Sequence, residues 1–241
     1  MTALRTVLFV VPLALGAVLA SPRPAQAQGL GCPAFDRPVL KLEPQMAAIR
    51  RDFSKTVQQL QAMPDHATGP AGAEHGRILG LAQAVVGERW QVSTKVSRKF
   101  GAQGVCASLS VLTVTFGYHE RNVFVAKELP QGTCIHREVM QHEMKHVAVD
   151  EALLKEFMPV LKRRLETVLS RQGSVRAPTQ EQAVATLSKP VEAALKDLRQ
   201  EFMKEREKRQ AKVDTLEEYR RVSSSCNGEL RNYLKPEKGR R

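Results

Sequence analysis

Two histidines and a glutamate near the middle of the chain form the pattern His-Glu-x-x-His, at His142, Glu143 and His146. Residues four apart lie on one face of an α-helix with their Cβ atoms about 5–6 Å apart, so both imidazoles could bind one tetrahedral Zn²⁺ ion. Glu143 is rotated by about 100° from His142, where its carboxylate could take a proton from a metal-bound water. The pattern predicts metal-assisted hydrolysis, most often of a peptide bond in a protein or peptide substrate.

A third metal ligand must come from another part of the sequence, because a catalytic zinc site takes three protein ligands. Asp150 lies four residues beyond His146. That position is about 6 Å further along the helix axis, too far for a short side chain unless the helix breaks. Asp150 therefore stays a weaker alternative.

A second long helix is the better source of that ligand. If the two helices form an antiparallel hairpin about a turn near residue 174, position 144 faces approximately position 204. Glu201 and Glu205 continue an otherwise apolar stripe of the second helix there. We select Glu205 as the third ligand, with Glu201 as its alternative. The competing interpretation is that both carboxylates are solvated, as charged helix faces usually are.

Four further side chains are candidates with weaker support. Asp214 is another alternative for the third ligand, and Tyr219 could donate a hydrogen bond to an oxyanion. His119 and His136 could contact substrate or an oxyanion, although each is also consistent with an ordinary surface or loop histidine. Spacing alone does not choose among them.

The elements that position the motif follow from hydrophobic periodicity. Apolar residues at helical spacing predict a long helix over residues 135–170, which contains the motif and Pro159. Thr179, with Gln182 three places later, resembles a capping box that opens the second helix. A helix is also expected over residues 46–63.

Strands are expected between the first of these helices and the motif. Alternation over residues 90–97 predicts a half-buried strand, and segments 109–116 and 122–126 are rich in Val, Thr and Phe. A turn is expected at 117–121, and residues 39–42 could add a short strand. The predicted fold is α+β: a small antiparallel sheet packed on the long metal-site helix, with a C-terminal helical hairpin.

The first 27 residues have the features of a secretory signal peptide. An apolar run over residues 7–20 is followed by Ala25-Gln26-Ala27, which predicts cleavage after Ala27 and a periplasmic or secreted location. We then expect a catalytic domain over residues 28–178 and a helical segment with a basic tail over 179–241. No later segment is apolar enough to span a membrane.

Charge and cysteine content narrow the partners and the compartment. The formal net charge of +12 favours anionic envelope components, but aromatic residues make up only 5% of the chain and no nucleic-acid partner is expected. Four cysteines in an exported chain predict two disulfides. We favour Cys106 with Cys134, which flank the same β region, and Cys32 with Cys226.

A helix that follows a small sheet and carries this motif resembles the zincin metallopeptidases. More narrowly, residues 78–170 resemble a bacterial family of secreted zinc-dependent proteases of unknown substrate, the domain-of-unknown-function 922 group. The resemblance implies zinc binding by His142 and His146 and a base role for Glu143. Lys145 departs from the uncharged residue usual in zincins, and the metzincin extension is absent. The alternative function is a non-catalytic basic envelope protein that binds a partner or an anionic polymer through its long helices.

Overall fold

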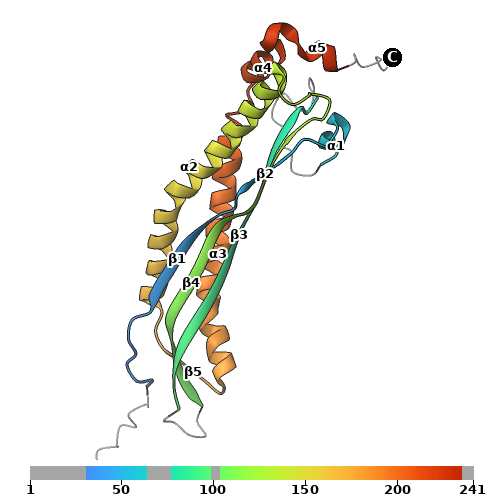
Figure 1. Cartoon of the computed structure of the whole chain (residues 1–241). Helices are drawn as coiled ribbons and strands as arrows, with labels where there is room; N and C mark the ends of the chain where they lie inside the picture. The colour runs from blue at the N-terminus through green and yellow to red at the C-terminus, as the bar shows by residue number, and fades with distance from the viewer. Residues whose placement is uncertain (1–30, 64–76, 99–103, 235–241) are drawn as a thin grey trace, which may run out of the picture. The chain divides into compact units, whose positions relative to one another are not determined.

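The computed structural model describes residues 31–63, 77–98 and 104–234. The predicted signal peptide, the glycine- and proline-rich segment 64–76 and the basic tail lie outside these ranges. Cys32–Arg241 belong to one compact unit. Within it the fold is mixed α+β, as the sequence predicts, with one sheet, two long helices and shorter C-terminal helices (Figure 1).

One long strand, β4 (Val105–Val125), organises the sheet. On one edge it pairs antiparallel with β3 (Gly80–Ser97). On the other edge it pairs in turn with β5 (Val175–Ala177, antiparallel), β1 (Val39–Met46, parallel) and β2 (Ile49–Asp52, parallel). The sheet is therefore mixed, and the expectation of an antiparallel sheet is wrong for β1 and β2.

The turn expected at residues 117–121 is absent, because β4 continues through it. Gly117 has a φ of 142°, and a Cβ at this position would collide with the carbonyl oxygen of Gln45 on β1. Glycine thus allows β1 and β4 to approach closely, and the strand passes on without reversing. The residue that indicated a turn is a site of close strand contact.

The helix expected over residues 46–63 is also wrong. That region contains the end of β1, all of β2 and a single short helix, α1 (Val57–Gln61), which Thr56 caps. Met46 at the end of β1 and Ile49 at the start of β2 follow helical spacing by sequence, yet the backbones of both strands bond to β4. Tertiary pairing overrides the local pattern here.

Both long helices occur where periodicity places them: α2 is Cys134–Arg171 and α3 is Gln180–Gln210. The hydroxyl of Thr179 accepts a hydrogen bond from the backbone N–H of Gln182, so the predicted N-cap is confirmed. Two shorter helices follow, α4 (Leu216–Gly228) and α5 (Leu230–Tyr233).

The main core lies between one face of the sheet and the two long helices, which run side by side (Figure 1). Alternate residues of β4, including Leu112, Val114 and Phe116, are fully buried against them. The ring of Phe202 on α3 meets that of Phe116 at a centroid distance of 5.2 Å. The helix α2 packs against both the sheet and α3. These contacts fix its rotation about its own axis, and therefore the direction in which the motif side chains point.

Candidate metal centre

The two motif histidines lie on α2 and point to the same side. Their ring centroids are 5.0 Å apart with planes at 87°, and His142 and His146 are 8% and 9% exposed. This arrangement follows from their four-residue spacing on a continuous helix. Two imidazole donors therefore converge in a buried position.

The third converging donor is Asp214, in the short connection between α3 and α4. Its Oδ1 atom lies 3.3 Å from Nε2 of His142 and 3.1 Å from Nε2 of His146. One donor atom from each of the three residues falls within 4.8 Å of the others, a geometry that could hold a metal ion. Burial alone would raise the pKa of Asp214, but hydrogen bonds from His142 and His146 hold it at about 2. Asp214 is therefore an anion at neutral pH.

The carboxylates that we preferred from sequence lie elsewhere. Glu205 accepts a hydrogen bond from Arg209 at 2.8 Å and is not part of the cluster, so the selection of Glu205 is corrected to Asp214. Glu201 pairs with Arg164. The helical register explains the shift: His146 of α2 faces Gln210 of α3, further along α3 than the hairpin estimate placed it.

Asp150 belongs to a buried network beside the cluster. Its two oxygens accept hydrogen bonds from Nε and Nη2 of Arg206 at 2.8 and 2.9 Å. It also accepts from the side-chain amide of Gln210 at 2.6 Å. With its oxygens engaged in this way, Asp150 acts as a support for Gln210.

Each histidine has an oxygen partner for its other ring nitrogen. Nδ1 of His142 lies 3.3 Å from Oε1 of Glu218, and Nδ1 of His146 contacts Oε1 of Gln210. Such partners fix the tautomer and orientation of metal-binding imidazoles. The unusual Lys145 has a role here, since its ammonium group donates to Glu218 at 2.6 Å.

Sequence reasoning missed both oxygen partners. A signal existed for Glu218, because Thr215 and Glu218 have the spacing of a capping box, and the Thr215 hydroxyl does accept from the N–H of Glu218. That spacing marks the start of α4 directly after Asp214. No comparable local pattern marks Gln210, which reaches His146 only through helix packing.

Glu143 lies beside the cluster and is 4% exposed. Burial raises its pKa to about 7, against the opposing effect of the nearby His146 and His142. The backbone N–H of Ala82 donates to its carboxylate. A Cβ on Gly80 would lie 2.5 Å from Oε1 of Glu143, so only glycine lets the start of β3 approach this closely. The carboxylate is thereby held in one place.

Tyr219 on α4 completes the surroundings of the cluster. Its hydroxyl donates to Oδ1 of Asp214 at 3.4 Å, and its ring centroid is 5.9 Å from that of His142. The other two candidate histidines are not in the cluster. His119 contacts Arg89 of β3, and His136 lines a separate cavity near the start of α2.

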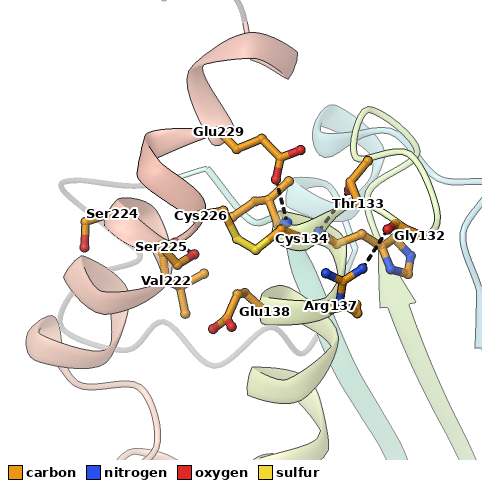
Figure 2. The surroundings of a disulfide bond; sticks show 12 residues. Gly132, Thr133, Cys134, Arg137, Glu138, Val222, Ser224, Ser225, Cys226 and Glu229 are labelled. Carbon is orange, nitrogen blue, oxygen red and sulfur yellow. Dashed lines mark hydrogen bonds between the residues drawn. A yellow bond between two sulfur atoms is a disulfide. The ribbon is translucent and has the colours of Figure 1, made fainter.

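A disulfide fastens the α4 segment, which follows Asp214, to α2. Cys226 is bonded to Cys134 (Figure 2). The second disulfide joins Cys32 to Cys106. The predicted pairing is therefore wrong, although two disulfides do form. Cys106 and Cys134 lie near opposite ends of the segment that contains β4, and the strand's length separates them. Beyond the disulfide, α4 buries only Val222 and is joined to α2 by polar contacts, such as Arg221 with Glu138 at the surface and Glu218 with Lys145.

Removing the Cys134–Cys226 bond is expected to weaken metal binding about tenfold or more, as losses of supporting partners do. Surface ion pairs, each contributing at most about 1 kcal/mol, are too weak to hold α4 in place of the covalent bond. The measurement is Zn²⁺ affinity of a double alanine variant at these cysteines, by competition with a chromogenic chelator.

The matched control is the double alanine variant of Cys32 and Cys106. The two bonds span similar separations, 92 and 74 residues, so the chain-entropy model gives each a stabilisation of about 4.5 kcal/mol. Both variants should lose comparable thermal stability, whereas only loss of Cys134–Cys226 should weaken Zn²⁺ binding. Equal metal affinities in the two variants would contradict this account.

The fold and the cluster together define an α+β protein with a candidate His–His–Asp metal centre and an adjacent buried glutamate. Comparison of the chain with protein-family models, with curated proteins and with solved structures finds no match. Two disulfides are typical of proteins that fold in an oxidising, extracytoplasmic environment. Among the described residues, none of the helices combines the length and apolar character that crossing a membrane requires.

Proposed function

We propose that this protein is an exported zinc-dependent hydrolase, a peptidase, with Glu143 as its general base. The observation that carries the proposal is the convergence of His142, His146 and Asp214 within 4.8 Å, beside a buried carboxylate on the same helix. A zincin-type enzyme related to the secreted family that the sequence resembles would have this set of groups. The protein substrate and the periplasmic or secreted location belong to the same proposal.

The donor set suits zinc. Two imidazoles and one carboxylate are three nitrogen and oxygen ligands, which is the number that leaves a fourth position for water in catalytic zinc sites. Their oxygen partners, Glu218 and Gln210, are of the kind that orient zinc-bound histidines. When bound, zinc would lower the pKa of a water molecule to about 7 and polarise a substrate carbonyl.

Side chains and backbone groups of the protein would then have separate roles in hydrolysis. Glu143, with a pKa of about 7, can accept and return a proton near neutral pH, where a general base is most effective. The backbone N–H of Ala82 keeps its carboxylate in position. Tyr219 keeps its hydroxyl proton, because burial raises its pKa above the usual value; by turning from Asp214, to which it donates at 3.4 Å, the hydroxyl could donate to a developing oxyanion.

Zinc binding is expected to strengthen with pH between about pH 5.5 and pH 8, because histidines bind metals only as neutral rings. Burial alone would lower the pKa of His142 and His146, but the hydrogen bond to Asp214 and the charge of Glu143, with smaller contributions from other partners, together outweigh burial and raise both. Without metal, protonation of these rings stabilises the folded chain at low pH, and this contribution is lost as the pH rises through their folded pKa. With zinc present, the stability of the folded chain should instead increase as the pH rises, because the neutral rings bind the metal.

Thermal unfolding with and without Zn²⁺ checks this prediction. The increase in Tm that zinc produces should be larger at about pH 8 than at about pH 5.5. An increase that is equal at both values, or larger at the acidic one, would exclude the two histidines as ligands.

The function itself is tested by metal removal. The purified chain should hydrolyse an unstructured protein such as casein, lose this activity when stripped by a chelator, and regain it with stoichiometric Zn²⁺. Activity that survives complete stripping would exclude the metal mechanism. Zinc binding without hydrolysis of any unfolded protein tested would favour the non-catalytic envelope protein instead.

A further inference from the structure

A cavity of about 320 Å³ lies between the end of β2 and the first turns of α2. It is lined by Arg51, Phe53, His136, Arg137, Met140 and Gln141. At about 100° per residue, the α2 side chains that line it point roughly 100–160° away from His142. The cavity therefore lies on a different face of α2 from the metal cluster, and nothing in the proposed hydrolysis uses it.

One wall of the cavity contains a buried histidine with unused hydrogen-bonding capacity. His136 is 7% exposed, and the edge of its ring meets Phe53 at a centroid distance of 4.9 Å. Its Nε2 atom has no hydrogen-bond partner among the described residues. Burial, and then the charge of Arg137, lower its pKa, so the ring is neutral at neutral pH. Buried polar atoms in native proteins are normally paired, so this nitrogen is an exception within the wall of the cavity.

Two arginines, Arg51 and Arg137, contribute to the lining of this cavity. Neither Arg51 nor Arg137 forms an ion pair with another residue in the described part of the chain. Arg137 donates one N–H to the carbonyl oxygen of Gly132 at 2.7 Å (Figure 2), which leaves its other N–H groups available. The N-terminus of α2 adds no free positive end, because the carboxylate of Glu229 accepts a hydrogen bond from the backbone N–H of Ile135 at 3.0 Å. The two guanidinium groups are therefore what favours an anion.

The cavity wall between these charges is apolar. Phe53 and Met140 contribute aromatic and thioether surface, and the volume is at the lower end of the range of about 300–1,000 Å³ for small-molecule sites. A small inorganic anion would leave this apolar surface without a partner. A neutral hydrocarbon would leave the two guanidinium groups without one. The occupant that satisfies both has a short apolar body and an anionic end.

We propose that this cavity binds a small amphipathic carboxylate. The apolar body packs on Phe53 and Met140. The carboxylate accepts hydrogen bonds from the guanidinium groups of Arg51 and Arg137 and lies against the ring of His136. Two sources have this chemistry, a short-chain fatty acid and the C-terminal residue of a peptide with an apolar side chain.

Calorimetric titration of the purified chain with sodium hexanoate tests the proposal. Hexanoate should bind, and 1-hexanol should bind about tenfold or more weakly, since it lacks charge-assisted hydrogen bonds. N-acetyl-leucine and its amide distinguish the sources. Selective binding of the free acid indicates a peptide C-terminus, whereas binding of hexanoate alone indicates a fatty acid. If hexanol binds as well as hexanoate, or if neither carboxylate binds, the proposal is wrong.

Variants can distinguish binding in this cavity from nonspecific attraction to the positively charged surface. Joint replacement Arg51→Gln and Arg137→Gln should weaken hexanoate about tenfold and leave hexanol unchanged. The matched control is Arg163→Gln, an exposed arginine further along α2, which should bind like the parent. His136→Phe keeps an aromatic ring against Phe53 and should also weaken hexanoate. An unchanged affinity in the double arginine variant would overturn the assignment.

A spectroscopic readout reports on the histidine directly. Bound carboxylate should move the imidazole resonances of His136 and raise its pKa, because a nearby anion favours the protonated ring. The same changes should occur in the His146→Ala variant, since the cavity and the metal cluster are separate. This result does not depend on whether the metal centre is catalytic. Resonances of His136 that stay fixed at saturating hexanoate would contradict the proposal.

Discussion

Replacing Glu143 by glutamine is expected to lower the rate of hydrolysis by about 10²–10⁴-fold, the range typical of a lost general base. Glutamine has nearly the same shape, so the contacts to Gly80 and Ala82 can be kept while the proton acceptor is lost. Zinc content should not change, because Glu143 is not among the converging donors. The measurement is kcat on a peptide or casein substrate, with bound zinc determined on the same sample.

Stability gives a second readout for the same variant. The pKa of Glu143 is raised to about 7 in the folded protein, so its buried charge costs folding free energy once the pH rises above the ordinary value near 4.5. Glu143→Gln should therefore leave the metal-free protein as stable as the parent, or more stable, near pH 8. Glu166→Gln on the exposed face of α2 is the matched control and should keep full activity. Undiminished hydrolysis in Glu143→Gln would rule out the base.

Replacing Asp214 by alanine is expected to weaken Zn²⁺ binding about 100-fold or more, since loss of an outer partner alone costs about 10–100-fold. Asp214 places one oxygen within 3.3 Å of both imidazoles, and no other acidic residue joins the cluster among the described residues. Competition with a chelator measures the affinity. Asp214→Asn, which keeps the shape of the side chain, should also bind Zn²⁺ more weakly. This variant shows whether a loss of affinity in Asp214→Ala comes from the missing ligand and not from a folding defect.

The informative control is Glu205→Ala. Glu205 is the carboxylate that helix geometry selects from sequence, but it is only half-buried and pairs with Arg209. Its removal should leave zinc affinity within about twofold of the parent, as expected for a surface ion pair. The opposite pattern, in which Glu205→Ala loses zinc and Asp214→Ala retains it, would mean that the site is built differently.

The sequence predicts the parts of the site that depend on one helix. His142 and His146 lie on one face because four residues span about one turn, and this holds for any continuous helix. The identity of the third donor depends on the register in which α3 packs against α2. The connection between these helices is not a tight turn, because β5 leaves it to pair with β4. That detour moves Gln210 and Asp214, rather than Glu205, to the level of His146.

The sheet was only partly predictable for a similar reason. Alternation identifies part of β3, since one of its faces is buried and the other exposed. The parallel pairing of β1 and β2 with β4 joins segments far apart in sequence, and their local pattern imitates a helix. The disulfides follow the same logic: Cys226 reaches Cys134 because α4 packs against the start of α2. Cysteine order in the chain carries no information about that contact.

The most direct test of the metal centre is the zinc content of the purified chain after reconstitution and removal of free metal. We expect one tightly bound zinc ion per chain in the parent and none in a variant that lacks both His142 and His146. A folded parent protein that retains no zinc, or a double variant that retains as much as the parent, would contradict it.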